Sequence, residues 1–196
     1  AALRSAGAGV LATDLVMSGE VENAFCSVRP PGHHAERAKA MGFCFFNNIA
    51  IAATHALEAH GLERVAVVDF DVHHGNGTED IFANDPRVLM VSTFQHPFYP
   101  YSGTEAPAGN MVNVPVPAGT RSDGFRAAVE RAWLPALLAS VALAQPALAA
   151  EPAAQGTKAP AVTCPAIANP NIACRPSARK QAAPMSANAG ARATPP

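Results

Sequence analysis

Apolar and polar positions repeat along the first two thirds of the chain with the periods expected of helices and strands. Three segments carry apolar side chains at helical spacing and are predicted to be helices: Leu3–Ser18, Asn47–His60, and a segment from Ser122 or Asp123 to about Leu137. The first two stop at Gly19 and Gly61, and glycine often follows a helix. Asn47 is predicted to cap the second helix, because its side-chain oxygen can accept a hydrogen bond from the first turn.

Four short apolar runs are predicted to be strands: Ala24–Arg29, Val65–Phe70, Val88–Ser92 and Val112–Val116. Val65–Phe70 is almost continuously apolar, which favours a strand buried on both faces of a parallel sheet. Pro115 cannot donate a hydrogen bond to a neighbouring strand, so the last run is expected at an edge or a strand end. Because helices alternate with strands, the predicted class is α/β with a mainly parallel sheet. Ligands of such sheets bind outside the carboxyl ends of the strands.

The composition changes near Leu138. All aromatic residues and all 7 histidines lie before that position, whereas residues 138–196 contain 20 Ala and 9 Pro. Such a segment has few large side chains to bury and cannot offset the entropy cost of ordering its backbone. We therefore predict one folded domain in residues 1–137 and a mostly disordered, Ala/Pro-rich tail in residues 138–196.

The start of this tail allows several interpretations. Leu134–Ala150 combines a short apolar run with small residues, as in an Ala-rich helix end that leads into a linker. It also resembles the later part of a secretory signal, although it lies inside the chain. A frameshift or a joined gene fragment would explain the change equally well, and the sequence leaves these alternatives open.

Charge and cysteine content narrow the function classes. The formal net charge is -1, and no cluster of Lys and Arg predicts nucleic-acid binding. The 4 cysteines form no C-x-x-C pair, which argues against a cysteine zinc site. Cys26 and Cys44 lie in apolar surroundings, as free thiols do in a reducing compartment. With no membrane-length apolar run and no recognised N-terminal signal peptide, we expect a cytoplasmic protein without membrane partners.

The strongest chemical signal is the segment Asp69-Phe70-Asp71-Val72-His73-His74-Gly75-Asn76-Gly77 after the second predicted strand. In an extended segment Asp69, Asp71 and His73 would share a face, and two buried carboxylates are costly without a positive partner. Carboxylate oxygen and imidazole nitrogen suit zinc, and also iron or other first-row metals. The glycines are expected to let the backbone turn tightly. The alternative is an aspartate that caps the next helix beside a core histidine.

Two further polar clusters follow predicted strands. His33 and His34 lie in a Pro/Gly-framed loop after the first strand, where they could transfer protons or simply lie at the surface. Asp69 or Asn76 could hold the far nitrogen of each ring and fix its tautomer. Ser92 and Thr93 begin a third cluster at the predicted end of Val88–Ser92.

Four stretches resemble successive motifs of the histone deacetylase family, in the family's order: RPPGHHAERAKAMGFCFFNNIAIAA, VDFDVHHGNGTEDIF, VLMVSTFQHPFYPYSGT and NMVNVPVP. Bacterial relatives of the class II deacetylases, including acetylpolyamine amidohydrolases, are most similar in style, and the resemblance covers about residues 1–137. It implies the arginase/deacetylase fold, a three-layer structure with helices on both faces of the sheet. Arginases carry an aspartate where this chain has Gly75, which favours the deacetylase branch.

The resemblance implies a role for each matching residue. Asp71 and His73 match two zinc ligands, and His33 and His34 match the tandem histidines beside the catalytic water, with His34 the general base. Asp69 matches the aspartate that supports His33. Asn76 matches the partner of His34, and an amide there would hold the ring without adding charge.

The resemblance also implies a substrate channel and a second cation site. Gly42 and Phe43 match one wall of the acyl-lysine channel, and Tyr99 falls where the family places the opposite aromatic; plain core packing is the alternative for both aromatic residues. Five positions match a structural site for a monovalent cation such as K+: Asp69, Asp71, His73, Ser92 and Thr93. For Ser92 the alternative is an ordinary strand-end hydroxyl.

The family mechanism needs two residues that the sequence does not supply. A second aspartate ligand and an oxyanion-stabilising tyrosine are expected from later strands, but no Asp, His or Tyr follows Trp133. We therefore predict an incomplete, truncated deacetylase domain. The intact protein would be a zinc-dependent amidohydrolase acting on acetyl-lysine or a small acetylated amine. The alternatives are an inactive fragment and a non-catalytic acyl-lysine binder.

Overall fold

A three-stranded parallel sheet organises the structure, a computed structural model that describes residues 1–142. The strands β1 (Val65–Asp69), β2 (Val88–Gln95) and β3 (Met111–Val116) follow one another in this order across the sheet. Asp69 pairs with Ser92 across β1 and β2, and Gln95 pairs with Val116 across β2 and β3. The parallel sheet predicted from the apolar runs is confirmed, with Pro115 on the strand at one end of this order.

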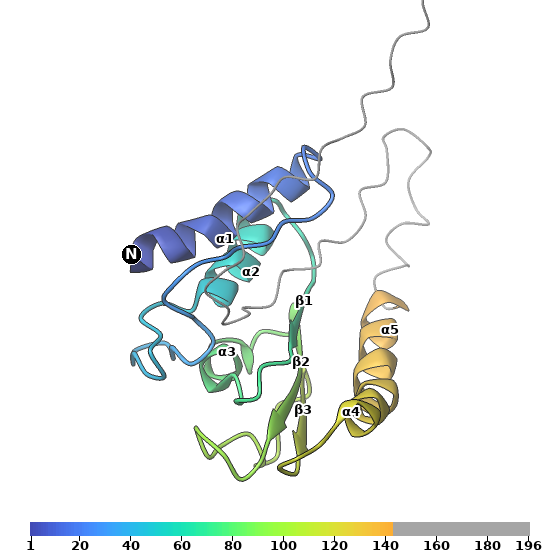
Figure 1. Ribbon diagram of the computed structural model, residues 1–196. Helices are drawn as coiled ribbons and strands as arrows, with labels where there is room; N and C mark the ends of the chain where they lie inside the picture. Colours follow the sequence, from blue (N-terminus) through green and yellow to red (C-terminus); the bar gives the residue numbers. More distant parts are fainter. Residues whose placement is uncertain (143–196) are drawn as a thin grey trace, which may run out of the picture.

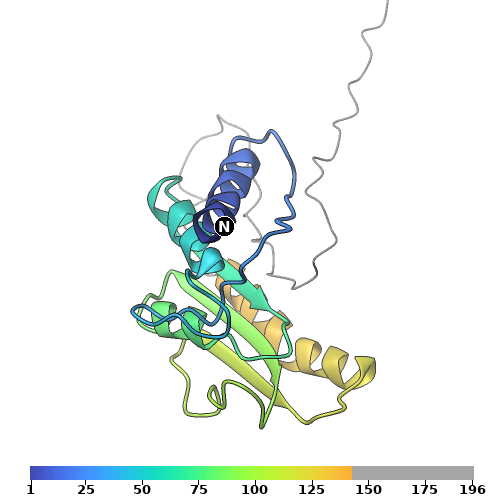
Figure 2. The ribbon, with the colours of Figure 1, turned by 60° about the vertical axis from the view of Figure 1, so that its left-hand side comes forward.

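Helices cover both faces of the sheet (Figures 1 and 2). One group consists of α1 (Ala2–Met17), α2 (Asn48–Glu58) and α3 (Asn76–Phe82). In this group α2 and α3 contact the strands, and α1 packs on α2. A continuous run on the opposite face consists of α4 (Ser122–Ala128), the π-helical turn η1 (Val129–Trp133) and α5 (Leu134–Ala142). The predicted α/β class with helices on both faces is therefore confirmed.

The first two predicted helices form where the sequence signals placed them. Asn47 caps α2, and its side-chain oxygen accepts a hydrogen bond from the backbone N–H of Ala50 at 3.0 Å. Gly19 and Gly61 follow these helices with φ of 75° and 67°, a conformation that costs glycine little. The apolar face of α2 enters the core, whose buried members are Ala50, Ala53, Ala56, Leu57, Val65, Val67, Phe82, Val88, Met90 and Met111.

Three local predictions are wrong. Residues 24–29 form no strand; this segment passes α1, where the Cys26 thiol lies 3.4 Å from the carbonyl oxygen of Ala8. β2 continues beyond Ser92 to Gln95, because its pairing with β3 extends that far. The last helical run begins after Arg121 and not after a capping Ser122 or Asp123, and no side-chain cap forms there.

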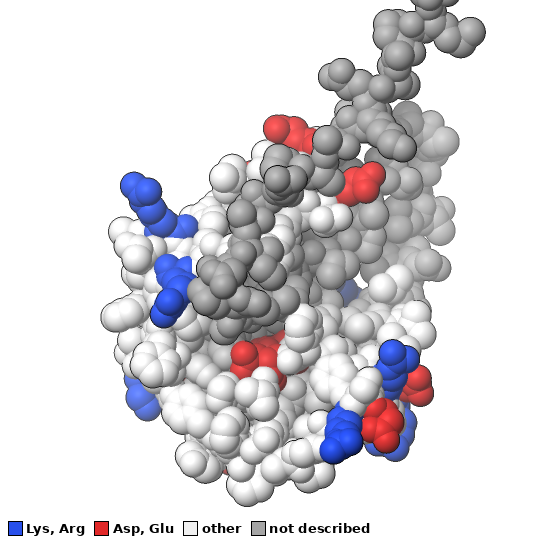
Figure 3. Space-filling view, viewed as in Figure 1, with Lys and Arg blue, Asp and Glu red and all other residues white. Residues whose placement is uncertain are grey.

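The predicted domain boundary at Leu137 stays a prediction. Residues 138–142 continue α5, and the rest of the Ala/Pro-rich segment, with Cys164 and Cys174, lies outside the described residues. None of the helices within residues 1–142 is long and apolar enough to cross a membrane. On the face shown in Figure 3, Lys and Arg side chains lie at the margins, and they do not gather into one basic patch.

Candidate active site

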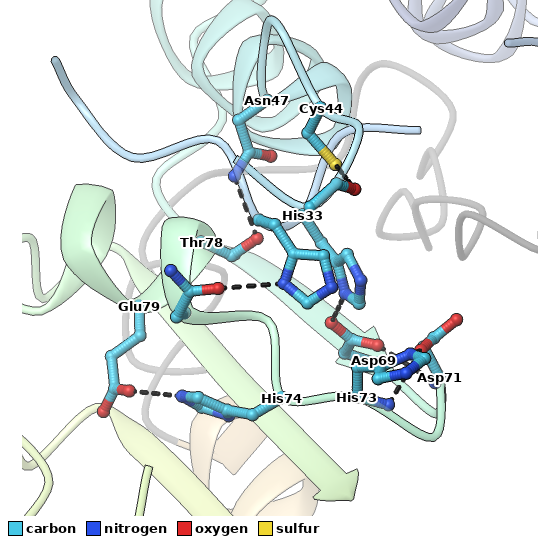
Figure 4. A network of polar contacts seen from close by, with 12 residues as sticks. His33, Cys44, Asn47, Asp69, Asp71, His73, His74, Thr78 and Glu79 are labelled. Carbon is cyan, nitrogen blue, oxygen red and sulfur yellow. Dashed lines mark hydrogen bonds and ion pairs between the residues drawn. The ribbon is translucent and has the colours of Figure 1, made fainter. Parts of the chain in front are cut away.

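The predicted site residues converge at the carboxyl end of β1. We call His33, His34, Asp69, Asp71, His73 and Asn76 the strand-edge cluster; most of its members are seen in Figure 4. The convergence does not arise from an extended segment as expected, since β1 ends at Asp69 and the chain then bends. Asp69 Oδ1 accepts from the backbone N–H of Asp71 at 3.1 Å, and Asp71 Oδ1 accepts from that of His73 at 2.8 Å. These turns place the side chains together.

His33 is held by Asp69. Nδ1 of His33 lies 2.9 Å from Asp69 Oδ2, with both side chains nearly buried (Figure 4). Burial lowers the pKa of His33, but the hydrogen bond to Asp69 and the negative charges of Asp69 and Asp71 outweigh it, so that the net pKa is raised. The carboxylate accepts the Nδ1 proton, which leaves Nε2 facing away from Asp69.

His34 is held by an amide instead of a carboxylate. Its Nδ1 lies 2.9 Å from Asn76 Oδ1, and Asn76 Nδ2 donates to Glu36 Oε1 at 2.7 Å. The contact with Glu36 fixes which end of the amide faces the ring, so Nδ1 of His34 carries the proton and Nε2 keeps its lone pair. Burial and the neighbouring His33 charge lower the pKa of His34 to about 4. His34 is therefore neutral at physiological pH and can accept a proton.

Asp71 and His73 offer an oxygen and a nitrogen to a metal. Asp71 Oδ1 and His73 Nδ1 lie 2.9 Å apart, close to the separation of about 3.3 Å between two ligands of a tetrahedral zinc ion. The donor set and spacing therefore fit a zinc ion. Within residues 1–142 no third His, Cys, Asp or Glu joins this pair at ligand distance. The ring of His73 stacks on Phe98, with centroids 5.0 Å apart, and this contact holds its orientation.

Glycines are needed at this site for close approach. Gly75 and Gly77 were predicted to permit a tight turn, but neither has a positive φ. A Cβ at Gly75 would collide with the Asp69 carboxylate, and one at Gly77 would collide with the backbone of Ala35. Gly42 does have a positive φ of 56°, and its Cβ would collide with the ring of His34.

Aromatic side chains surround the histidines. Tyr99 lies edge-on to His34, with ring centroids 5.1 Å apart, and Phe98 stacks on His73. Phe43 is 90% exposed, so core packing does not account for it. Phe98 was missed by the sequence reasoning, although its place next to Tyr99 was available as a signal.

Two of the predicted monovalent-cation residues, Asp69 and Ser92, are neighbours across the sheet. Ser92 pairs with Asp69 across β1 and β2, and the hydroxyl oxygens of Ser92 and Thr93 are buried with no hydrogen-bond partner among the described residues. Buried hydroxyl oxygens without partners are costly. Adjacent strand residues point to opposite faces of the sheet, so a cation beside Asp69 would satisfy the Ser92 hydroxyl and not that of Thr93. The alternative of a strand-end hydroxyl is wrong for Ser92, because β2 continues for three more residues, to Gln95.

Beside the cluster lies a buried network that sequence reasoning left without a role. His74 is 1% exposed and its Nε2 lies 2.6 Å from Glu79 Oε2, while Asn113 donates to Glu79 Oε1 at 2.9 Å. The partners come from a loop, a helix and a strand, so no local spacing in the sequence links them. This network ties the loop after β1 to α3 and β3 (Figure 4).

Comparisons with known proteins identify similar domains. Residues 1–147 match the model of the family described as histone deacetylase domain. Over 135 residues the chain is 44% identical to a probable deacetylase of Archaeoglobus fulgidus, which covers 66% of this chain and 37% of the relative. It is 53% identical over 100 residues to the human polyamine deacetylase HDAC10, covering 50% of this chain and 15% of that protein.

A solved structure gives the same result. The crystal structure of acetylpolyamine aminohydrolase from Burkholderia pseudomallei matches with a TM-score of 0.64 and 41% identity, and the match covers 69% of this chain and 41% of that one. The chain thus spans about two fifths or less of the length of these relatives.

Proposed function

The chain belongs to the histone deacetylase family, and on this premise we propose that its strand-edge cluster is part of a zinc-dependent deacetylase centre. The proposed reaction is hydrolysis of the acetyl amide of acetyl-lysine or of a small acetylated amine. The observation that carries the proposal is the convergence of a neutral histidine, a carboxylate-bound histidine and an Asp/His pair with metal-ligand spacing at the carboxyl end of one strand.

The two tandem histidines are proposed to divide the proton-transfer work. His34 is neutral, and its free Nε2 can take the proton of the attacking water and later return it to the leaving amine. His33, whose pKa is raised by Asp69, carries positive charge more readily and can stabilise negative charge that develops on the acetyl oxygen. Their different partners therefore give adjacent residues different tasks.

Asp71 and His73 are proposed as two ligands of the metal. A zinc ion held there would polarise the acetyl carbonyl and lower the pKa of the attacking water. Asp71 supplies a carboxylate oxygen, and stacking on Phe98 keeps His73 in place. The buried, unpartnered hydroxyl of Ser92 supports a monovalent cation, such as K+, beside Asp69, to which Thr93 would contribute its backbone oxygen.

The aromatic side chains support an acetylated amine on an alkyl tether as the substrate class. Phe43 is exposed next to Gly42, whose backbone lies against His34, and Tyr99 lies against the same ring. Such surfaces can bury a methylene chain without needing hydrogen bonds, which suits an acetylated amine on an alkyl tether. The names of the human and Burkholderia relatives support small acetylated polyamines alongside acetyl-lysine.

A second candidate function is binding without turnover. Catalytic zinc sites usually have three protein ligands, and residues 1–142 supply two to the strand-edge cluster. No Tyr follows position 101 to stabilise the oxyanion. The 196-residue chain by itself would then bind an acetylated ligand weakly and leave it intact.

Activity assays separate the two candidates. We would measure acetate release from an acetyl-lysine peptide and from N-acetylputrescine, with zinc and with a chelator. Zinc-dependent turnover that is lost in His34→Gln and kept in Asp80→Asn supports the deacetylase. Turnover that survives both the chelator and His34→Gln contradicts it. Ligand binding without acetate release favours the second candidate.

A further inference from the structure

A second group of histidines meets an aspartate far from the strand-edge cluster. Asp14 lies on α1, His55 lies in the last turn of α2, and His60 follows that helix. Nε2 of His55 lies 2.7 Å from Asp14 Oδ1, and Nε2 of His60 lies 2.8 Å from the same oxygen. We call these three residues the helix cluster.

We propose that the helix cluster is a separate binding site for a divalent first-row metal ion, with zinc as the best fit, that clamps α1 to α2. Two imidazole nitrogens and one carboxylate oxygen are the donor set that such ions prefer. The three donor atoms all lie within 4.8 Å of one another. Among His, Cys, Asp and Glu of residues 1–142, this is the one group of three with that property.

The geometry needs only a small adjustment to hold the ion. Ligands of a tetrahedral zinc ion lie about 3.3 Å apart, so each nitrogen must move away from Asp14 Oδ1 by about 0.5 Å. The Asp14 side chain is 46% exposed and has room to make this shift. The two imidazole rings are nearly perpendicular, at 86°, and both Nε2 atoms approach the same point. The remaining coordination position would face solvent.

The backbone already brings the ligands together. α1 and α2 pack so closely that a Cβ at Gly9 would lie 3.2 Å from Cβ of Ala52. Gly61 has a φ of 67°, which lets the chain leave directly after His60 while its ring turns back towards α1. The ligand-bearing segments are thus ordered without the ion, and binding would cost little further chain entropy.

The charge at the helix cluster also suits a cation. Hydrogen bonds from His55 and His60 hold the pKa of the Asp14 carboxyl below its ordinary value, so the group is ionised at neutral pH. In the part of the chain that the structure describes, no Lys or Arg side chain pairs with this carboxylate. To bind the ion, each ring would carry its proton on Nδ1, which leaves the Nε2 lone pair beside Asp14 for the metal.

This site is distinct from the strand-edge cluster. His60 lies shortly before the start of β1, whereas the strand-edge cluster gathers at the carboxyl end of that strand, so the two lie towards opposite ends of β1. The clamp would join α1 to the helix that contributes most to the core (Figure 1). We therefore expect the ion to stabilise the fold without taking part in proton transfer.

Zinc titration of the whole 196-residue chain tests the proposal. Asp71→Asn/His73→Gln serves as background, because it removes the other metal-binding pair. In this background we expect one zinc ion per chain, shifts of the ring nitrogens of His55 and His60 in nitrogen-15 NMR spectra, and a rise of several degrees in melting temperature. Adding His60→Gln or Asp14→Asn should weaken zinc binding by more than about tenfold.

Matched variants separate a metal site from a plain ion pair. Asp123→Asn removes one exposed carboxylate elsewhere and should leave zinc affinity unchanged. Far-UV circular dichroism at low zinc identifies any variant that fails to fold. If a variant does not fold, the NMR shifts of His55 and His60 in the background chain still show whether zinc binds at the helix cluster. Zinc binding that is unaffected by both His60→Gln and Asp14→Asn, or that leaves the His55 and His60 nitrogens unshifted, would falsify the proposal.

Discussion

The strand-edge cluster and the helix cluster use the same kinds of side chain in opposite settings. In the first, His33 and His34 are buried, each has its own partner, and glycines let the backbone press against the rings. In the second, His55 and His60 share one half-exposed carboxylate between two helices. The hydrogen-bond partner and the burial of a histidine, more than its residue type, therefore decide its chemical role. In the strand-edge cluster they shift the pKa values of two adjacent histidines in opposite directions. In the helix cluster they bring two ring nitrogens to one carboxylate oxygen.

The largest expected effect concerns the close packing of backbone in the strand-edge cluster, which glycine substitutions test. Gly77→Ala places a Cβ against the backbone of His34 and Ala35, and backbone cannot move aside. We expect a loss of about 3 kcal/mol or more in the free energy of unfolding, measured by urea denaturation. Gly7→Ala in α1, where a Cβ meets nothing within 4 Å, is the control and should raise stability by up to about 1 kcal/mol. Equal changes in the free energy of unfolding for Gly77→Ala and Gly7→Ala would show that close packing at Gly77 is not required.

Stability against pH tests the buried histidine. The pKa of His34 is about 4, against 6.5 for the ordinary side chain, so the folded chain resists protonation there. Neutral His34 therefore contributes to the free energy of unfolding in full above pH 6.5. This contribution is lost as the pH falls from 6.5 towards 4, because the unfolded chain binds the proton before the folded chain does. Over that range the metal-free chain should lose about 3 kcal/mol relative to His34→Gln.

The control for this experiment is His33. Its pKa is raised, so its contribution has the opposite sign: it is complete below the unfolded value and is lost as the pH rises through the folded value. Urea denaturation with chelator would give the free energy of unfolding of the wild type and of each variant at several pH values. The difference between wild type and His34→Gln should grow as the pH rises, whereas the difference between wild type and His33→Gln should shrink. Slopes of the same sign would contradict a lowered pKa of His34 beside a raised pKa of His33.

A third test concerns the network that supports the strand-edge cluster. Glu79→Ala leaves the buried Nε2 of His74 without a partner and frees the amide of Asn113. The expected loss is about 2 kcal/mol, seen as a lower urea midpoint with an unchanged slope. Asp80→Ala removes the next carboxylate along α3, which is exposed and accepts from the backbone N–H of Arg37. That change should cost less than about 1 kcal/mol, and a cost as large as that of Glu79→Ala would show that burial of the partner is not decisive.

The sequence predicted most elements of the fold because they obey local rules. Asn47 as a helix cap, Gly61 as a stop and the apolar run of β1 each follow from a few neighbouring residues. Residues 24–29 failed because an apolar run does not determine whether the chain joins the sheet or passes α1. The length of β2 failed because it depends on the pairing with β3, which no local pattern encodes.

The candidate site was predicted as far as its motifs extend. The pairing of His33 with Asp69 and of His34 with Asn76 is found as expected. Glu36, which orients the Asn76 amide, was missed because it lies 40 residues away and no local spacing links it to Asn76. The helix cluster was missed for the same reason: Asp14 is 41 residues from His55, and only the packing of two helices brings them together. Roles that depend on long-range contacts had no local signal.

The smallest expected effect concerns the helix cluster without metal. Asp14→Asn removes the shared charge, but the side chains are partly exposed and water can replace their hydrogen bonds. The melting temperature of the chelator-treated chain should fall less than for Glu79→Ala, and the fall should shrink further in 1 M salt, which screens exposed charges. Asp123→Asn gives the baseline for losing one exposed carboxylate. A large fall in melting temperature that does not depend on salt would mean that the helix cluster is a rigid structural network like that of His74. The two clusters would then differ only in how deeply they are buried.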